Sequence, residues 1–314
     1  MKRRDFIKAG LAAAAASQLG GLKAVEAAIS GREIPKRLYK DGVKLSIIGF
    51  GGIVVAGMEQ KDANGIVAES IERGVNYFDV APSYWSGEAE EKLGIALKPY
   101  RNQVFLACKT QRRDAYGAQR ELEESLGRVG TDHFDLYQFH AVTTTWDVEQ
   151  IFAPGGAAEV FTKARQEGKV RFIGFSAHSV DAALSMMGRF DFDSVLFPVN
   201  FVCYAQGDFG PQVVERAKEK GVARLALKAL AYTPWGVEER KYPKCWYRPI
   251  DDRELARQAL RFTLSEDVTA AIPPGDERLF LLALELAGGF TPLTPQERQQ
   301  LLASTEGLQP IFYA

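Results

Sequence analysis

Four side chains that can bind or move a proton occur at or just after the ends of three consecutive short apolar runs in this sequence. Asp79, Lys109 and His140 each stand near the end of a short apolar run, and Tyr84 follows Asp79 in the next turn. An ammonium group lowers the pKa of a nearby phenol, and a carboxylate keeps that ammonium charged and in place. Such a set is suited to protonating an oxygen on which negative charge develops, as in the reduction of a carbonyl by hydride.

Each of these residues also has a simpler explanation when it is taken alone. An aspartate at a strand end often caps a turn, a lysine there is usually solvated, and a histidine is more often a core residue than a catalyst. Their occurrence at the same end of three consecutive predicted strands favours a shared site. The set contains no nucleophile–base pair and no metal-ligand cluster, so the hydride must come from a cofactor.

Short apolar runs alternate with helical patterns along the chain, which predicts parallel β/α units. The predicted strands lie within residues 44–52, 75–82, 104–110, 134–141, 170–178, 194–202, 222–230 and 268–275. The predicted helices lie within residues 63–74, 87–97, 117–130, 157–169, 180–190, 210–221 and 253–266. Eight such units match a (β/α)8 barrel of ~250 residues in one α/β domain. A doubly wound sheet is the alternative, but Gly49, Gly51 and Gly52 do not have its G-x-G-x-x-G spacing.

The barrel would bring the four proton-handling residues together, because sequential parallel strands are neighbours and their carboxyl ends share one mouth. The segments 142–156 and 231–251 are predicted to be irregular loops at that mouth. We expect Trp85, Trp146 and Trp235 to line a substrate pocket there, and Trp246 also suggests an aromatic-lined pocket. Packing of a long loop on the rim is the simpler role for each tryptophan alone.

The composition is that of an ordinary soluble globular protein. The chain has 314 residues, a formal net charge of −1 and 46% hydrophobic residues. This charge argues against nucleic acid or an anionic membrane as the main partner. Cys108, Cys203 and Cys245 are odd in number and far apart, which indicates neither a disulfide framework nor a zinc site. A Cys203–Cys245 bridge is the less favoured alternative, and no metal is expected.

The first thirty residues have a different character from the rest. "MKRRDFIKAG" has two adjacent arginines, one further residue, Phe-Ile and then a lysine, and an alanine-rich stretch follows. The pattern resembles a twin-arginine export signal over residues 1–30, with a small-residue cleavage site near residue 27. It predicts a periplasmic protein that meets the twin-arginine export machinery. The alternative is a basic amphipathic helix that stays attached and leaves the protein at the membrane.

From about residue 38 onward the chain resembles the aldo-keto reductase family. The resemblance rests on "FDVAPSY" with "EEKLG", "FLACKT", "DLYQFH", "EGKVRFIGFS" and "IPPG", in the family's order. It implies a reductase barrel over residues 38–314 that binds NADPH, less often NADH, across its mouth. Asp79, Tyr84, Lys109 and His140 match the family's tetrad. By that resemblance Tyr84 is the general acid, Lys109 and Asp79 tune it, and His140 orients the substrate carbonyl.

The nucleotide side departs from the family pattern. Ser176 is kept, but Ala177 replaces the usual asparagine and Pro198 the usual glutamine of the carboxamide site. The cofactor-binding residues that the resemblance implies are Gly52, Asp79, Ser176, His178, Asn200, Leu227, Lys228, Leu230, Gly275 and Arg278. Among them, His178 or Asn200 would replace the missing amides, and Lys228 would reach the pyrophosphate.

The sequence does not decide between NADP(H) and NAD(H) as the coenzyme. Arg278 fits a 2′-phosphate site loosely, while Asp276 and Glu277 would repel that phosphate. The family default therefore favours NADP(H), and NAD(H) stays open. The main hypothesis is reduction of a small aldehyde or ketone by a monomer or small homo-oligomer. The alternatives are a non-catalytic nicotinamide-nucleotide-binding subunit or redox sensor on the same barrel, and an unrelated barrel lyase.

Overall fold

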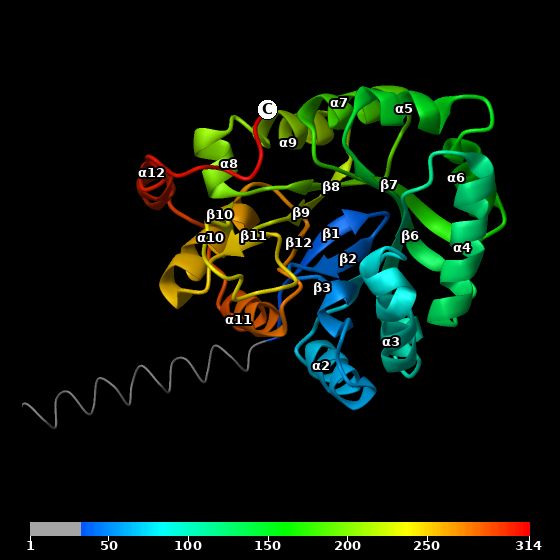
Figure 1. Cartoon of the computed structure of the whole chain (residues 1–314), viewed down its shortest axis with the longest axis horizontal. Coiled ribbons are helices and arrows are strands. Elements are labelled where there is room, and N and C mark those ends of the chain that lie inside the picture. Colours follow the sequence, from blue (N-terminus) through cyan, green and yellow to red (C-terminus); the bar gives the residue numbers. More distant parts are fainter. Residues whose placement is uncertain (1–32) are drawn as a thin grey trace, which may run out of the picture.

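The computed structural model describes residues 33–314, so the predicted export signal at residues 1–30 lies outside the described residues. In Figure 1, helices form a ring around a central set of strands. Within residues 33–314, none of the helices combines the length and the apolar character that crossing a membrane requires.

Eight parallel strands form the barrel wall, in the order β12-β9-β8-β7-β6-β5-β4-β3. Their bounds are β3 Phe50–Gly51, β4 Tyr77–Asp79, β5 Phe105–Thr110, β6 Phe134–Val142, β7 Val170–Ala177, β8 Ser194–Pro198, β9 Ala223–Leu227 and β12 Ala270–Ile272. A parallel bridge from Ile48 to Ala271 brings the first strand back to the last. The predicted single-domain (β/α)8 barrel is therefore confirmed.

The helices follow the strands in chain order and cover the outside of the barrel (Figure 1). They are α2 Gln60–Glu72, α3 Glu88–Leu97, α4 Ala115–Val129, α5 Thr145–Phe152, α6 Ala157–Gln166, α7 Val180–Arg189, α8 Phe201–Gln206, α9 Pro211–Glu219, α10 Arg253–Ser265, α11 Glu277–Ala287 and α12 Pro295–Ala303. Short 3-10 turns are η1 Gly52–Val55, η2 Tyr84–Gly87 and η3 Arg101–Gln103.

The prediction of one strand within residues 44–52 was wrong. Its first part is β2 (Val43–Ser46), which pairs antiparallel with β1 (Lys36–Lys40), and only the last residues join the barrel as β3. Asp41 and Gly42 have positive φ angles of 48° and 80°, as a tight hairpin turn requires.

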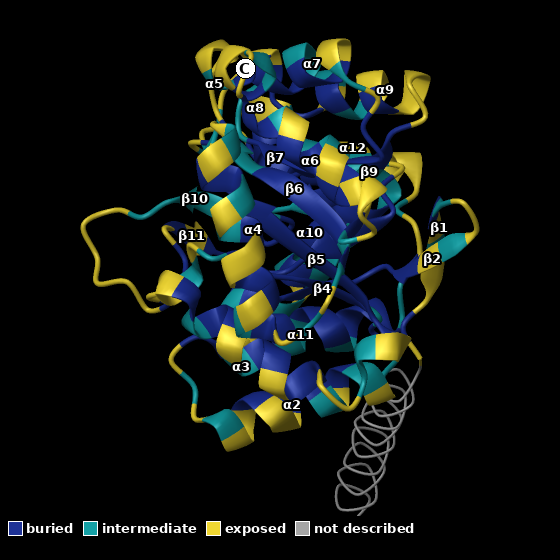
Figure 2. Ribbon diagram, turned by 90° about the vertical axis from the view of Figure 1, so that its right-hand side faces the viewer, coloured by how far each residue is buried: buried dark blue, intermediate teal, exposed yellow. Residues whose placement is uncertain are grey.

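The β1–β2 hairpin closes the barrel at the amino-terminal ends of its strands. Tyr39 and Leu45 belong to the same buried cluster as the inward-facing side chains of the strands. The Tyr39 hydroxyl lies 2.9 Å from the Ser194 hydroxyl in a buried hydrogen bond. Figure 2 shows this hairpin and the β10–β11 pair on opposite sides of the molecule.

The two segments predicted as irregular loops contain regular structure. Within 142–156, α5 begins at a capping box in which the Thr144 side chain accepts from the Asp147 amide and the Asp147 carboxylate accepts from the Thr144 amide. Within 231–251, β10 (Ala231–Pro234) pairs antiparallel with β11 (Tyr247–Pro249). Local capping and a pairing across a long loop explain both departures.

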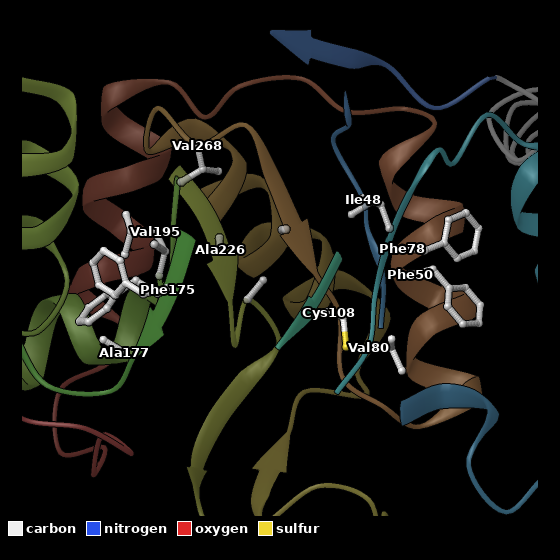
Figure 3. Close-up of a cluster of buried hydrophobic side chains, with 14 of the residues drawn as sticks. Ile48, Phe50, Phe78, Val80, Cys108, Phe175, Ala177, Val195, Ala226 and Val268 are labelled. Atoms are coloured by element: carbon white, nitrogen blue, oxygen red, sulfur yellow. The ribbon is translucent and has the colours of Figure 1, made fainter. Parts of the chain in front are cut away.

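A continuous apolar layer lies between the strands and the helices (Figure 3). Phe50 and Phe78, on the paired strands β3 and β4, stack with ring centroids 5.3 Å apart, and Phe280 of α11 packs edge-on against Phe50. Cys108, Cys203 and Cys245 are buried free thiols. This layer fixes the strand ends from which the site is built.

Gly94 sets how closely α3, the helix that follows Tyr84, packs on α4. A Cβ atom at Gly94 would lie 2.7 Å from the carbonyl carbon of Val129. We expect Gly94→Ala to lower the free energy of unfolding by about 2 kcal/mol, because backbone must move to admit the methyl group.

Gly127→Ala on α4 is the matched control, since its Cβ meets no heavy atom within 4 Å. It should stabilise by about 0.5–1 kcal/mol in urea denaturation. Equal effects of the two substitutions would contradict the packing argument.

Candidate active site

Lys109 connects a buried carboxylate to a phenol at the mouth of the barrel. Its ammonium donates to a carboxylate oxygen of Asp79 and to the Val80 carbonyl, 3.2 Å away, and lies 3.3 Å from the Tyr84 hydroxyl. Asp79 and Lys109 are each 1% exposed, while Tyr84 is half-buried. The structure thus brings together the three residues that the sequence placed on two neighbouring strands and one turn.

Two further side chains hold Asp79 in place. Gln138 donates its amide to the second carboxylate oxygen over 2.9 Å, and the Tyr77 hydroxyl donates to the same oxygen over 3.3 Å. Strand alternation puts Tyr77 and Asp79 on one face of β4, and Lys109 lies opposite Gln138 in the β5–β6 register. The sequence analysis assigned no role to Gln138, although its place on the inner face was a usable signal.

A strained turn aims Tyr84 over this pair. Its amide donates to the Ala81 carbonyl over 3.0 Å, and the next two residues, Trp85 and Ser86, have left-handed φ angles of 50° and 53°. Such angles are unfavourable for residues with a Cβ atom, so the surrounding packing must enforce them. Gly87 completes the turn at φ 96° and leads into α3. The turn separates Tyr84, which faces the pocket, from Trp85, which is 46% exposed.

The pKa of Tyr84 is raised, whereas the sequence suggests that Lys109 lowers it. Burial raises the pKa of the phenol above its ordinary value, and the nearby Lys109 ammonium offsets this only in part. Burial is the largest influence on the pKa of Lys109 and acts to lower it, but the Asp79 carboxylate together with Tyr84 and Cys108 outweighs burial, so the pKa of Lys109 is raised. At neutral pH the site therefore holds a charged lysine beside a protonated phenol, which is the form that donates a proton.

His140 completes the group from β6. Its ring is nearly perpendicular to that of Tyr84, at 85° with centroids 5.9 Å apart, and its Nδ1 lies 3.5 Å from the Ser83 hydroxyl. Burial, followed by the positive charge of Lys109, holds the pKa of His140 well below its usual range. The imidazole is therefore neutral at pH 7 and can donate one hydrogen bond to a carbonyl oxygen.

The lowered pKa of His140 has a measurable consequence for turnover. For the aldehyde reduction that the sequence predicts, we expect kcat/KM with an uncharged aldehyde to show no step between about pH 6 and pH 8, because His140 stays neutral throughout that range. The measurement is a pH profile of aldehyde reduction. A fall in kcat/KM with an apparent pKa near 6.5 that disappears in His140→Gln would contradict this assignment.

A pocket opens above Tyr84, Lys109 and His140 at the carboxyl ends of the strands. It is lined from β3 by Gly51, from β7 by Ser176, from β9 by Leu227 and from β12 by Ile272. The β9–α10 segment adds the remaining wall, with Lys228, Lys244, Trp246 and Tyr247. Lys244 donates to the Val54 carbonyl over 2.7 Å, which ties this segment across the mouth to η1.

Besides Asp79, this pocket is lined by five of the residues that the sequence analysis expects to bind the nucleotide: Ser176, His178, Leu227, Lys228 and Gly275. His178 follows β7 and stacks on Phe312 of the carboxyl-terminal tail, with centroids 5.3 Å apart. Its Nε2 is buried and has no hydrogen-bond partner within residues 33–314.

The other predicted nucleotide residues do not line the pocket. The Asn200 amide donates to the carbonyls of Lys228 and Ala231, and its oxygen caps α8, so no group of this side chain is left for a carboxamide. Gly52 packs against Val80, and Leu230 is buried in the apolar layer.

Arg278 does not line the pocket, because it pairs with Asp276, the residue that caps the amino terminus of its own helix, α11. Its guanidinium pairs with the Asp276 carboxylate, 3.1 Å from each of two oxygens, and stacks on the Tyr242 ring. Asp276 also caps α11 by accepting from the Arg278 amide over 3.0 Å.

The three tryptophans expected in the pocket lie elsewhere. Trp146 is 69% exposed on α5, because the helix that replaced the predicted loop turns it to solvent. Trp85 is on the outer side of the η2 turn, and Trp235 donates its indole N–H to the Cys245 carbonyl over 2.8 Å. Trp246, which the sequence also indicates for an aromatic-lined pocket, does line it together with Tyr247. The place of Tyr247 depends on contacts over a long loop.

The (β/α)8 barrel carries a buried Asp79–Lys109 pair beneath Tyr84, as the resemblance to the aldo-keto reductases implies. Residues 47–245 match the model of the aldo/keto reductase family, and the chain belongs to that family. It is 24% identical over 309 residues to an uncharacterized oxidoreductase of Bacillus subtilis, which covers 89% of this chain and 98% of the relative. It is 26% identical to L-galactose dehydrogenase of Arabidopsis thaliana over 71% of this chain and 73% of that one.

Solved structures agree with this placement. The holo form of an aldo-keto reductase from Bacillus halodurans matches 90% of this chain and 98% of its own, with a TM-score of 0.69 and 25% identity. An aldo/keto reductase from Klebsiella pneumoniae, solved with NADP and acetate, matches 90% of this chain and 98% of its own. Its TM-score is 0.64 and its identity 18%, so it supports the fold.

Proposed function

We propose that this protein reduces a small aldehyde or ketone to the alcohol, with Tyr84 as the general acid. The observation that carries the proposal is the unbroken chain from the Asp79 carboxylate through the Lys109 ammonium to the Tyr84 hydroxyl, at the floor of an open pocket. A protein that only binds nucleotide has no need of this relay, which favours the enzyme over the binding-subunit alternative.

The roles follow from the positions of the residues. The neutral His140 donates a hydrogen bond to the substrate carbonyl and orients it beneath Tyr84. Tyr84 then donates its proton to the oxygen as negative charge develops there. Lys109 stabilises the resulting phenolate from 3.3 Å, and Asp79 keeps Lys109 charged and directed at it. Each group is preorganised by buried neighbours, so little rearrangement accompanies the proton transfer.

A nicotinamide nucleotide fits the remaining wall of the pocket. The Nε2 of His178 has no hydrogen-bond partner within residues 33–314, and the Ser176 hydroxyl accepts from the Ala141 amide and can still donate. These groups provide polar contacts for a carboxamide, and Leu227 provides an apolar surface for a ring. When bound, this cofactor supplies the hydride. We propose NADP(H), the family default and the ligand of the Klebsiella structure, with NAD(H) as the alternative because Asp276 occupies Arg278.

The direct test of this function is nucleotide oxidation with a panel of uncharged aromatic aldehydes. Oxidation of NADPH or NADH that depends on the aldehyde supports the reductase. If the wild type and Tyr84→Phe are equally inert while the nucleotide binds to both, the protein is a binding subunit or redox sensor. If no nicotinamide nucleotide binds at all, the unrelated lyase becomes the better hypothesis. Mass spectrometry of nucleotide retained through native purification identifies the coenzyme.

We further propose export by the twin-arginine route, which carries folded proteins and would allow a nucleotide to be acquired before export. In a host with that route, we expect the wild type in the periplasmic fraction. A variant with Arg3→Lys and Arg4→Lys should stay in the cytoplasm, because the signal is an address read by a receptor. An unchanged distribution of the variant between fractions would contradict the prediction, and an uncleaved membrane-bound wild type would support the alternative.

A further inference from the structure

Lys228 is a cation of the pocket wall to which the catalytic arrangement gives no role. It lines the same pocket as Tyr84 and His140, yet within residues 33–314 no carboxylate lies within ion-pair distance of it. Its neighbours are the rings of Tyr247 and Trp246, whose centroids lie 4.9 Å and 5.4 Å from the ammonium. Aromatic faces attract a cation weakly and do not neutralise it, so this charge lacks a counterion.

The backbone fixes Lys228 in this position. Its φ angle is +66°, in the left-handed region that residues with a Cβ atom seldom adopt. Its carbonyl accepts from the Ala231 amide over 2.9 Å and from the Asn200 side chain over 3.1 Å, and these bonds hold the strained conformation. Strain maintained by buried hydrogen bonds is characteristic of functional positions, where it aims a side chain.

The charge on Lys228 acts on the part of the pocket where the substrate reacts. Burial, followed by the charge of Lys228, lowers the pKa of His178 to about 4. Lys228 is also among the cations that lower the pKa of His140, after burial and after Lys109. The ammonium therefore lies close enough to both imidazoles for its field to reach them.

We propose that Lys228 binds an anionic group, a carboxylate, carried by the carbonyl substrate of this pocket. The proposal rests on the proposed reductase function and narrows its substrate class to carbonyl compounds with a carboxylate at the far end from the reacting carbon. An incoming carboxylate would supply the counterion that Lys228 lacks within residues 33–314 and would form a charge-assisted hydrogen bond at the aromatic wall. Binding of the cofactor pyrophosphate by Lys228, which the sequence analysis expects, is the alternative that the experiment distinguishes.

The binding of a carboxylate should depend on pH in a way that identifies Lys228. Burial lowers the pKa of Lys228 to about 8. The other titratable groups that face it are His140, His178, Cys245 and Tyr247. Both histidines are neutral above pH 7, the pKa of Cys245 is raised to about 11, and that of Tyr247 is raised well above its ordinary value. Since Lys228 is charged below its pKa, carboxylate binding is strongest below about pH 8 and is lost above it.

The test measures binding without turnover. Wild-type protein is titrated with benzoate and, as the uncharged match, with benzamide, while tryptophan fluorescence is followed. We expect Lys228→Met to weaken benzoate at least tenfold and to leave benzamide unchanged, and Lys228→Arg to retain benzoate. Lys241→Met is the matched control, because it removes an exposed lysine of the same segment that pairs with Asp251. Above about pH 8 the wild-type Kd for benzoate should rise about tenfold per pH unit, and that of Lys228→Arg should not.

The outcomes separate this proposal from the proposed function. Equal benzoate binding by wild type and Lys228→Met would overturn it. The proposal would also be overturned if Lys228→Met bound inorganic pyrophosphate and NADPH tenfold more weakly and benzoate as tightly as the wild type. Lys228 would then bind the nucleotide. In turnover, Lys228→Met should raise KM for 4-carboxybenzaldehyde and not for 4-formylbenzamide. Lys228-dependent benzoate binding without reduction of either aldehyde would support the anion site and contradict the reductase.

Discussion

Replacing Tyr84 by phenylalanine is expected to lower kcat for aldehyde reduction by about a thousandfold. Among residues 33–314, Tyr84 is the one group that lies within hydrogen-bonding distance of Lys109 and also faces the pocket as a proton donor, and the substitution removes its hydroxyl. General acid catalysis of this kind contributes about 10²–10⁴ in rate. The nucleotide Kd should stay unchanged, because in the proposed mechanism the lost hydroxyl acts on the substrate oxygen. The measurement is kcat with a saturating uncharged aldehyde, next to nucleotide binding by fluorescence.

Tyr39→Phe is the matched control for this loss of a phenol. Tyr39 is buried at the opposite end of the barrel, where its hydroxyl bonds to Ser194. Its replacement should lower the free energy of unfolding by about 1 kcal/mol and leave kcat unaltered. A Tyr84→Phe enzyme with more than a tenth of the wild-type kcat would show that another group, or water, supplies the proton.

Removing Lys109 is expected to affect folding and catalysis together. Lys109→Met leaves the Asp79 carboxylate buried without its cation, and removing one partner of a buried ion pair costs about 3–5 kcal/mol. Catalysis should fall as well, because the ammonium that lies 3.3 Å from the Tyr84 hydroxyl is gone. Urea denaturation reports the first effect and steady-state reduction the second.

The double variant Lys109→Met with Asp79→Asn separates the two effects. Asparagine can still accept from Tyr77 and carries no charge, so most of the lost stability should return. The activity should not return. A Lys109→Met protein as stable as the wild type would contradict the description of this ion pair as buried and mutually dependent. Recovery of activity in the double variant would remove Lys109 from the catalytic role.

The barrel and the centre of its site were predictable from sequence because local rules determine them. Strand alternation places Asp79 and Lys109 on inward faces, and sequential parallel strands are neighbours, so the two side chains had to meet. His140 followed by the same reasoning on the next strand. Nothing more than the period of a strand and the order of the chain was needed.

Other features depend on contacts that no local pattern shows. The hairpin was missed because β2 runs directly into the first barrel strand, although Asp41-Gly42 is a recognisable turn signal. Asn200 looked available for a ligand, but both ends of its amide are engaged by the backbone. The pocket wall depends on the bond from Lys244 to the Val54 carbonyl, across 190 residues of chain.

Transfer of deuterium to product tests the central claim most directly. Wild-type protein, Tyr84→Phe and Tyr39→Phe would be incubated with benzaldehyde and NADPH deuterated at carbon 4 of the nicotinamide, and the benzyl alcohol examined by mass spectrometry. The arrangement of Asp79, Lys109 and Tyr84 predicts labelled alcohol from the wild type and Tyr39→Phe, and about a thousandfold less from Tyr84→Phe. The account would be contradicted if the wild type bound the nucleotide but formed no labelled benzyl alcohol, or if all three proteins labelled the alcohol equally.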